Sequence, residues 1–404
     1  MKDKKHILII SQYFFPESFR INDICQELVK RGYKITVLTG IPNYPDGKFF
    51  SGYNWFKKRR EVWEGIEIIR IPIVSRGKSN IRLILNYYSF VVSGFFWNLF
   101  TKLNADMVFT FEVSPMIQAK IGIWYAQKHK VPNYLYVQDL WPDNLEIVGG
   151  IHNKVILAHY WKMSNKIYKN YTNILATSQS FVEEIENRMQ KNAEKVVYWP
   201  QYAEDFYVPT KCRNVYEILN NEKFKIVFTG NIGYAQGLEI LPKTALHLKD
   251  KGISDICFVI VGNGRYKEHL IAETCDLGVE KMFLFMERQP SDAIPNILSS
   301  CDVAFVSFMN NALFEKTIPA KLQSYMACGM PIIGSASGET ERIINEANCG
   351  QCAQIGNVKE LVQAIENIRN SDLKLMSCNS RNYYLKNFDK RILMDRLITL
   401  LESI

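Results

Sequence analysis

The fold of this 404-residue chain is indicated most clearly by residues 314–335, which read FEKTIPAKLQSYMACGMPIIGS. The stretch predicts a loop, a short helix that opens at Pro319 and stops at Gly329, and then a buried strand. Proline at the first helical position wastes no hydrogen bond, and glycine after the last turn takes the left-handed conformation that closes a helix. The loop 316–318 therefore faces a helix N-terminus. Free amides and the helix dipole there favour a phosphate, with Lys321 one turn in.

The length and composition predict two globular domains, since 404 residues with 47% hydrophobic content can bury two cores. The net charge of +8 is uneven: residues 1–210 hold 27 Lys and Arg against 19 Asp and Glu, whereas residues 211–404 hold 22 of each. An excess confined to the first half suits an anionic partner, such as a membrane face or a phosphorylated acceptor. Ordinary solvated lysines would give the same count.

The first residues predict a parallel sheet. An apolar strand over 6–10 is followed by a helical pattern over 21–29 and a second strand over 34–39. A strand–helix–strand unit implies parallel pairing, with a ligand edge at the carboxyl ends of the strands. Further strands are expected over 107–111, 134–137 and 174–176. A strand at the N-terminus, in place of a signal peptide, and nine scattered cysteines lead us to expect a reduced, cytoplasmic setting.

Carboxylates follow two of these strands. Glu112 comes directly after the strand 107–111, and Asp139 and Asp143 lie behind the strand 134–137. Both loops are at strand carboxyl ends, where a doubly wound sheet keeps its site. The aspartates fit contacts with acceptor hydroxyls or proton transfer. They fit equally a loop-bracing hydrogen bond for Asp139 and a helix N-terminal charge for Asp143.

An uncharged run extends from Leu83 to Thr101 and is as long as a membrane span, which takes roughly 17 to 25 residues. Polar residues recur along it at helical spacing. A spanning helix would also put the strands before and after it in different compartments. The pattern therefore favours an interfacial helix or a buried domain helix over a true span.

The second half begins a new sheet. Residues 199–209, bounded by Pro200 and Pro209, predict a linker. The strand 224–229 then leads into a glycine-rich turn, 230–237, that feeds a helix. On its own such a turn is a weak signal, because many nucleotide-binding sheets contain one.

Taken in order, these motifs resemble glycosyltransferase family 4, whose members have the GT-B fold. The form PAKLQSYMACGMP is similar to a bacterial branch that includes N-acetyl-L-fucosamine transferases of O-antigen and capsule synthesis. The resemblance covers nearly the whole chain. It implies an α/β fold of two Rossmann-like, doubly wound domains facing a cleft. The expected parts are an acceptor-binding, membrane-facing domain at 1–200, a nucleotide-sugar domain at 201–380, and a helix at 381–404 that crosses back.

The resemblance also implies site residues. Family members hold the donor diphosphate with an arginine and a lysine in the glycine-rich turn, and here Asn231 and Gln236 fill those places. Positive potential must then come from Lys321, Arg265 or Arg288, and we expect Lys321, with Asp139 and Asp143, to be catalytic. The expected donor-binding residues are Gly230, Asn231, Gln236, Gly262, Gly264, Arg265, Arg288, Thr317, Ile318, Pro319, Ala320, Gln323 and Ser324.

On the acceptor side we expect Arg20, Asn43, Tyr44 and Glu112. Arg20 lies in the first loop, where many family members carry a Gly-Gly pair, and a plain surface arginine is an equally fair reading. Asn43 and Tyr44 belong to a loop rich in proline and aromatic residues.

The chain departs from the family at its two glutamates spaced by seven residues. Their places fall on Lys316 and Ser324, so both carboxylates are missing. Gln323 and Ser324 could bind ribose as neutral substitutes. The change puts the orientation of the donor in question more than the fold.

The resemblance implies a retaining glycosyltransferase that moves a sugar from a UDP-sugar to a lipid-diphosphate-linked acceptor at the cytoplasmic face of the cell membrane. No Asp-x-Asp metal cluster occurs, so we expect metal-independent chemistry, with no cofactor and no nucleic-acid partner. A catalytically silent GT-B membrane partner is the alternative that the missing glutamates suggest. A sugar-nucleotide epimerase is a further one, although the six histidines do not cluster in any suitable loop.

Overall fold

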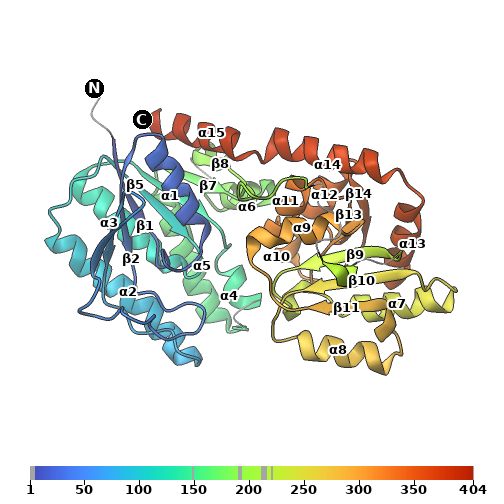
Figure 1. Ribbon diagram of the computed structural model, residues 1–404. Helices are drawn as coiled ribbons and strands as arrows, with labels where there is room; N and C mark the ends of the chain where they lie inside the picture. Colours follow the sequence, from blue (N-terminus) through green and yellow to red (C-terminus); the bar gives the residue numbers. More distant parts are fainter. Residues whose placement is uncertain (1–4, 148–149, 190–192, 211–215, 220–221, 404) are drawn as a thin grey trace. The chain divides into compact units, whose positions relative to one another are not determined.

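The computed structural model of the chain describes residues 5–147, 150–189, 193–210, 216–219 and 222–403. Two units emerge, each a sheet covered by helices (Figure 1). Unit 1 comprises residues 1–177, 181–199 and 402–404, and unit 2 comprises residues 178–180 and 200–401. The expected crossing of residues 381–404 to the first domain stays a prediction.

Unit 1 is built on an eight-stranded sheet with the order β3-β4-β2-β1-β5-β6-β7-β8. Neighbouring strands are parallel except for the antiparallel pair β3 and β4. The predicted strands are confirmed to within one residue at either end. The strands are β1 (His6–Ile10), β2 (Lys34–Thr39), β3 (Arg60–Trp63), β4 (Ile66–Arg70), β5 (Met107–Glu112), β6 (Asn133–Val137), β7 (Asn173–Ala176) and β8 (Val196–Tyr198).

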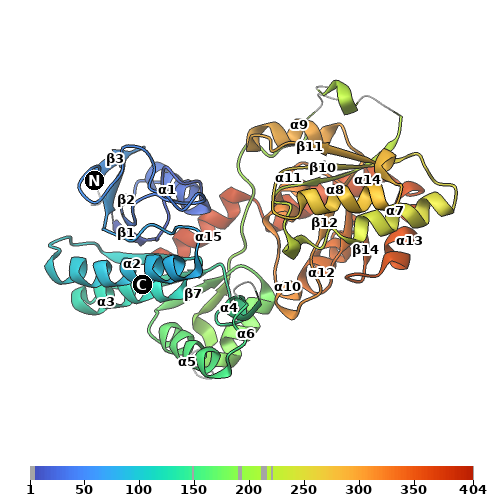
Figure 2. The ribbon, with the colours of Figure 1, turned by 90° about the horizontal axis from the view of Figure 1, so that it is seen from below.

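Helices cover both faces of this sheet. α2 and α3 lie on one face and α1 on the other (Figure 2). The helices are α1 (Arg20–Lys30), α2 (Asn80–Phe100), α3 (Ala119–His129), α4 (Asp143–Ile147), α5 (Lys154–Lys169) and α6 (Gln179–Met189), with the 3₁₀ turns η1 (Met116–Gln118) and η2 (Ala193–Lys195).

The uncharged run forms α2. Among the described residues it is the one helix long and apolar enough to cross a membrane, yet only 28% of its apolar window is buried. One stripe, which includes Phe90, Gly94 and Asn98, packs inward, and Gly94 lets Ile121 of α3 approach so closely that a Cβ would stand 2.3 Å from it. Because β4 and β5 on either side of α2 belong to one sheet, a single crossing is excluded. The other face of α2 remains exposed.

Unit 2 has a six-stranded, all-parallel sheet with the order β11-β10-β9-β12-β13-β14. Its central strands β9, β10 and β12 are largely apolar runs, as expected for a sheet covered on both faces. The strands of the sheet are β9 (Phe224–Thr229), β10 (Ile256–Val261), β11 (Phe283–Met286), β12 (Val303–Ser307), β13 (Ile332–Ser335) and β14 (Gly350–Ala353).

The helices of unit 2 follow the alternating pattern of a doubly wound sheet. The α-helices are α7 (Ile240–Asp250), α8 (Lys267–Asp276), α9 (Ile294–Ser299), α10 (Ala312–Glu315), α11 (Ala320–Ala327), α12 (Glu339–Glu346), α13 (Val358–Arg369), α14 (Leu373–Asn387) and α15 (Lys390–Glu402). The 3₁₀ turns are η3 (Glu217–Leu219), η4 (Tyr234–Gln236), η5 (Glu280–Met282) and η6 (Ser291–Ala293).

Residues 314–335 form the predicted loop, helix and strand, with one correction. Pro319 has extended backbone angles and caps α11, so the first helical residue is Ala320. Gly329 has φ of 69°, which confirms the left-handed conformation after the helix. The strand β13 follows directly.

Candidate functional site

Glycines bring two loops of unit 2 together at the carboxyl ends of β9 and β10. The amide of Gly230 donates to the carbonyl of Val261 at 2.9 Å, and Gly262 has φ of 147°. A Cβ on Gly262 would stand 1.9 Å from the carbonyl oxygen of Gly230, and one on Gly264 would stand 2.1 Å from that of Ile232. Only glycine permits this contact. The three predicted glycines therefore shape the site through backbone approach.

Lys321, in the first turn of α11, points into this glycine-rich loop. Its Nζ donates to Oε1 of Gln236 at 2.5 Å and lies 3.7 Å from the centroid of the Phe228 ring. A Cβ on Gly230 would be 3.8 Å from the same nitrogen. Burial lowers the pKa of Lys321 to about 7, since no carboxylate forms an ion pair with it among the described residues.

The side chain of Gln236 thus binds Lys321, and the backbone of Gln236 is held by a second hydrogen bond, to its main-chain carbonyl oxygen. Its carbonyl oxygen accepts a hydrogen bond from the hydroxyl of Ser307, at the end of β12, at 2.5 Å. Sequence reasoning missed Phe228 and Ser307 as parts of the site. The aromatic residue two positions before the glycine turn was the available signal for Phe228.

The other predicted cations lie at the same sheet edge but in solvent. Arg265 follows the Gly-x-Gly turn after β10, Arg288 follows β11, and both are exposed. Asn231 is exposed as well. The structure therefore encloses one of the predicted phosphate-binding groups, Lys321, and leaves these three at the surface.

The residues around the N-terminus of α11 are largely occupied by local hydrogen bonds. The Thr317 hydroxyl donates to the carbonyl of Leu313 at 2.9 Å, and that of Ser324 to the carbonyl of Ala320 at 3.2 Å. Gln323 is buried, and its Oε1 has no hydrogen-bond partner within the described part of the chain. Ile318 is also buried. Their contacts with a donor stay predictions.

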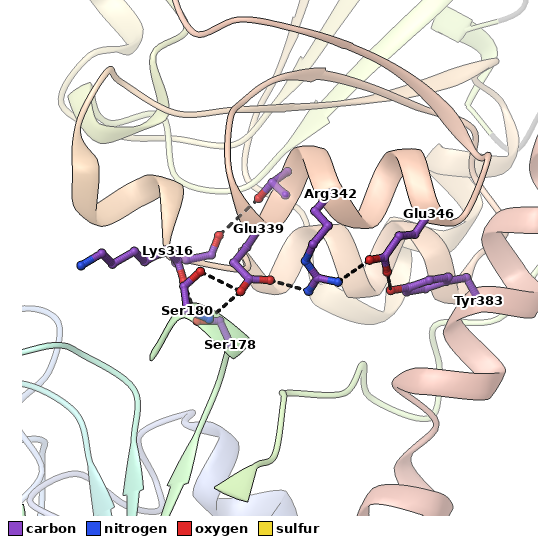
Figure 3. Close-up of polar contacts among 9 residues, drawn as sticks. Ser178, Ser180, Lys316, Glu339, Arg342, Glu346 and Tyr383 are labelled. Carbon is purple, nitrogen blue, oxygen red and sulfur yellow. Dashed lines mark hydrogen bonds and ion pairs between the residues drawn. The ribbon is translucent and has the colours of Figure 1, made fainter. Parts of the chain in front are cut away.

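A carboxylate that sequence reasoning missed lies beside this helix. Glu339 opens α12 and is 3% exposed; its carboxylate accepts from the amide of Ser180 at 2.6 Å and from the Ser180 hydroxyl at 2.9 Å. Arg342 donates to its other oxygen at 2.6 Å and to Glu346 at 2.6 Å (Figure 3). Ser178 donates to the carbonyl of Lys316 at 2.6 Å.

Gly338 explains why this carboxylate can stand there. Its φ is 65°, and a Cβ would be 2.1 Å from the carbonyl oxygen of Glu315. The Gly338-Glu339 pair after a buried strand was the signal that could have found the network.

In unit 1, Glu112 and Asp139 lie at the carboxyl ends of neighbouring strands, as predicted. Glu112 is 0% exposed, and neither carboxylate oxygen has a hydrogen-bond partner among the described residues. Burial, and then the charge of Asp139, hold the pKa of Glu112 well above its ordinary value. Asp139 accepts from the Ser114 amide at 2.8 Å and from its hydroxyl at 2.7 Å. Burial raises the pKa of Asp139, and the two bonds oppose the rise.

Asp143 is held apart from this pair by an ion pair. It opens α4, and Arg188 of α6 donates to its carboxylate at 2.7 Å. Arg188 also donates to the carbonyl of Trp141 at 2.6 Å and to Glu184 at 2.8 Å. These contacts give Asp143 a structural role, and a catalytic role stays a prediction.

Hydrogen bonds to buried groups hold the predicted acceptor loop that contains Asn43 and Tyr44. Asn43 is 0% exposed, its amide donates to Glu17 at 2.7 Å, and its side-chain oxygen accepts from the amide of Arg76 at 2.8 Å. Tyr44 is 39% exposed, so its ring is available to a ligand. Arg20 opens α1 and is half-buried. The bracing is the observed role of Asn43, and contact with an acceptor stays a prediction for all three.

No group of three His, Cys, Asp or Glu side chains within the described residues could hold a metal ion. Lys321 and the exposed Arg265 and Arg288 are basic side chains at this edge of the sheet.

The two parallel-sheet units are those of the GT-B glycosyltransferase fold, and residues 215–387 match the family Glycosyl transferases group 1. This part of the chain is therefore a glycosyl transferase group 1 domain. The predicted fold class is confirmed, whereas the fucosamine-transferase branch is not tested by these similarities.

One protein of similar sequence and two solved structures of similar fold show the extent of the likeness. The chain is 28% identical over 356 residues to Escherichia coli K12 WcaI, whose name places it among colanic acid biosynthesis glycosyl transferases; the match covers 83% of this chain and 84% of WcaI. Sucrose-phosphate synthase from Thermosynechococcus elongatus superposes with a TM-score of 0.76 at 15% identity, covering 99% of both chains. Anabaena HepE in complex with UDP-glucose superposes with a TM-score of 0.69 at 14% identity, covering 99% of this chain and 100% of HepE.

Proposed function

We propose that this chain is a retaining glycosyltransferase that moves a sugar from a UDP-sugar to a lipid-diphosphate-linked acceptor in the synthesis of a cell-surface polysaccharide. The observation that carries the proposal is the position of Lys321. The amino group of Lys321 lies in the first turn of α11, against a glycine-rich loop, and no carboxylate among the described residues forms an ion pair with it, which suits a diphosphate. The solved complex of HepE with UDP-glucose, on the same fold, supports this reading.

In the proposed reaction the bond between the sugar C1 and the diphosphate oxygen breaks. A new bond forms from C1 to the acceptor oxygen on the same face of the sugar, and the acceptor's hydroxyl proton passes to the departing diphosphate oxygen, so that UDP leaves. Negative charge grows on the diphosphate as its bond to C1 lengthens. Lys321, the amides at the start of α11 and the nearby arginines would stabilise that charge in a pre-organised way.

For the donor sugar we propose an N-acetylated 6-deoxy sugar such as N-acetyl-L-fucosamine. The support is the similarity of the stretch around α11 to the fucosamine-transferase branch. The relationship to WcaI supports the broader assignment to exopolysaccharide or lipopolysaccharide synthesis.

We also propose that the protein is peripheral on the cytoplasmic face of the membrane, where a lipid-linked acceptor resides. The exposed side of α2 supports this, with Ile81, Leu99 and Phe100 at 73%, 50% and 79% exposure. Beside α2 lies a groove of about 1080 Å³ that combines apolar and basic walls, including Phe96, Phe100 and Arg60. An apolar chain attached to a diphosphate has matching chemistry.

One observation favours a catalytically silent membrane partner instead. The two family glutamate positions hold Lys316 and Ser324, and the Ser324 hydroxyl bonds to its own helix. A chain that has lost its donor-orienting carboxylates could keep the fold without turnover.

One assay separates the two functions. The purified protein is incubated with candidate UDP-sugars, and release of UDP is measured with and without a lipid-diphosphate-sugar acceptor. A transferase releases UDP at a rate that rises when the acceptor is added. Binding of UDP without release from any donor and acceptor pair would support the silent partner.

A further inference from the structure

The helices on one face of unit 1 carry an unbalanced charge. α2, α3 and α5 contain no aspartate or glutamate and seven basic side chains. These are Arg82, Lys120, Lys128, Lys154, Lys162, Lys166 and Lys169. Since the whole chain has a net charge of +8, this helical layer holds nearly all of its imbalance.

Three of these lysines line one cavity. A groove of about 580 Å³ runs between α3 and α5, with Lys120 on the α3 side, Lys162 and Lys166 on the α5 side, and Trp124 as an apolar wall. None of the three lysines is in an ion pair with a carboxylate among the described residues. The groove is therefore positive and uncompensated.

The lysines are close enough to affect one another. Burial, and then the charge of Lys166, lower the pKa of Lys120. Holding like charges around one groove costs free energy, and an anion placed among them removes that cost. The groove is therefore suited to a phosphate.

The surroundings of the groove are apolar, which a soluble phosphate ester would not require. On α5, Val155 is 79% exposed and lies on the same helical face as Lys162 and Lys166, at spacings of seven and eleven residues. Phe95 of α2 packs edge-on against Trp124 with ring centroids 5.3 Å apart, which joins the exposed apolar side of α2 to the groove. Figure 2 shows α2 and α3 as neighbouring helices. Apolar side chains beside ammonium groups match the boundary between acyl chains and phosphates in a bilayer.

We propose that the α3–α5 groove binds the phosphate headgroup of an anionic phospholipid while the exposed side of α2 and Val155 rest in the bilayer interface. The inference deepens the membrane association of the proposed function by giving it a defined headgroup site. It rests on that function only for its biological setting, because lipid binding is measured without donor or acceptor.

The test uses the full chain and vesicles of phosphatidylcholine with and without phosphatidylglycerol. The variant carries Lys120→Gln, Lys162→Gln and Lys166→Gln. The matched control removes three exposed lysines of unit 2, through Lys243→Gln, Lys359→Gln and Lys374→Gln, so the net charge changes equally. We expect the groove variant to bind phosphatidylglycerol vesicles about a hundredfold more weakly than the unaltered protein, since each basic residue near an anionic surface adds to the attraction.

The control variant should lose only a few-fold, because charges beyond about 10 Å are screened at 0.1 M salt. Equal losses in both variants would overturn the groove site and leave net charge as the cause. Equal binding to vesicles lacking phosphatidylglycerol would overturn it too. Displacement of the protein from vesicles by glycerol phosphate at low concentration would show that the groove takes soluble phosphate esters and not the bilayer.

A second variant tests the apolar part. Val155→Ser with Leu99→Ser changes two exposed side chains, so folding is not at risk. Binding should weaken on neutral and anionic vesicles alike. UDP release is measured in parallel without vesicles, and a protein that binds lipid but releases no UDP would count against the transferase and not against the groove.

Discussion

The two units place opposite charges at the same kind of position. Unit 2 encloses a cation, Lys321, at the carboxyl ends of its strands, where a glutamine and an aromatic ring are its partners. Unit 1 encloses carboxylates there, and the two carboxylate oxygens of Glu112 have no hydrogen-bond partner within the described chain. In each case burial shifts the pKa toward the neutral form, downward for Lys321 and upward for Glu112.

The difference shows how one fold supports two kinds of site. Parallel strands bring their carboxyl ends to one edge whatever side chains they carry. The loops then decide what stands at that edge: glycines let two loops approach each other beside Lys321 in unit 2, and the acidic residues Glu112 and Asp139 stand there in unit 1. A buried group without a counter-charge is costly unless a ligand supplies one.

The largest effect is expected from removing the enclosed cation. Lys321→Ala should lower kcat by a hundred- to a thousand-fold, or roughly 3 to 4 kcal/mol, because the lost charge stabilises the departing diphosphate most in the transition state. UDP affinity should fall far less. Steady-state rates and calorimetric UDP binding measure the two effects separately.

Gln236→Ala and Asn231→Ala are the comparison variants. Each removes a neutral group at the same loop, and each should reduce kcat less than Lys321→Ala. Near-normal turnover in Lys321→Ala would show that the lysine is a structural group, and Arg265 and Arg288 would become the next candidates.

Much of the fold could be predicted from the sequence. Strands such as β1, β2 and β9 are apolar runs bounded by polar loops, and periodicity alone locates them. The edge strand β3 and its neighbour β4 were missed because both are short and neither is a continuous buried run: β3 alternates between exposed and half-buried residues, and β4 interrupts its buried residues with Glu67 and Ile69. The position of α11 and of Lys321 in its first turn followed from local helix signals.

The partners of the site residues could not be predicted. Periodicity does not show that Gln236 binds Lys321, because the two residues are 85 positions apart in the sequence. Nor does it show that Ser180 binds Glu339, 159 positions away, or that the Lys321 amino group lies over the Phe228 ring. Asn43 shows that a sequence pattern also fails to reveal which side chains are already bonded within the protein. Its loop resembled a ligand-binding loop, but its side-chain oxygen accepts a hydrogen bond from the amide of Arg76.

A second prediction concerns the uptake of a proton by Lys321 when a diphosphate binds. Burial lowers the pKa of Lys321 to about 7, so above that pH the free protein holds a neutral amine. A bound diphosphate favours the charged form, and binding at pH 8 should therefore take up a proton. Affinity should then fall by up to tenfold for each pH unit above about 7. Calorimetry at pH 8 in two buffers of different ionisation enthalpy measures the uptake.

Lys321→Met should abolish the proton uptake, and Lys243→Met, at an exposed position of α7, should not. Phosphate groups titrate near pH 6, so the ligand contributes little at pH 8. Equal uptake in Lys321→Met would place the titrating group elsewhere.

A third prediction tests the acidic side of the comparison by stability. The folded-state pKa of Glu112 is raised, so the unfolded chain loses its proton first as pH increases, and the folded protein loses stability between the two pKa values. Glu112→Gln removes this penalty. The melting temperatures of variant and unaltered protein should lie closest near pH 4, and the variant should gain as pH rises toward 8, by roughly 1.4 kcal/mol for each unit of pKa difference.

Glu64→Gln, at an exposed position, is the control and should show no such trend. A difference between Glu112→Gln and the unaltered protein that stays constant from pH 4 to 8 would mean that Glu112 is ionised in the folded state.

The smallest expected effect is that of removing divalent metal. Mg²⁺ and Mn²⁺ favour oxygen ligands such as carboxylates, and no group of three His, Cys, Asp or Glu side chains that could hold a metal occurs within the described residues. Because Lys321 and the helix amides supply the positive charge, turnover should survive excess EDTA unchanged, and Mg²⁺ or Mn²⁺ should not restore Lys321→Ala. If EDTA abolished activity and Mn²⁺ restored it, the cation would arrive with the nucleotide. The positive charge at the unit 2 site would then come from a metal ion bound with the nucleotide and not from Lys321. The comparison between a protein cation in unit 2 and protein carboxylates in unit 1 would no longer hold.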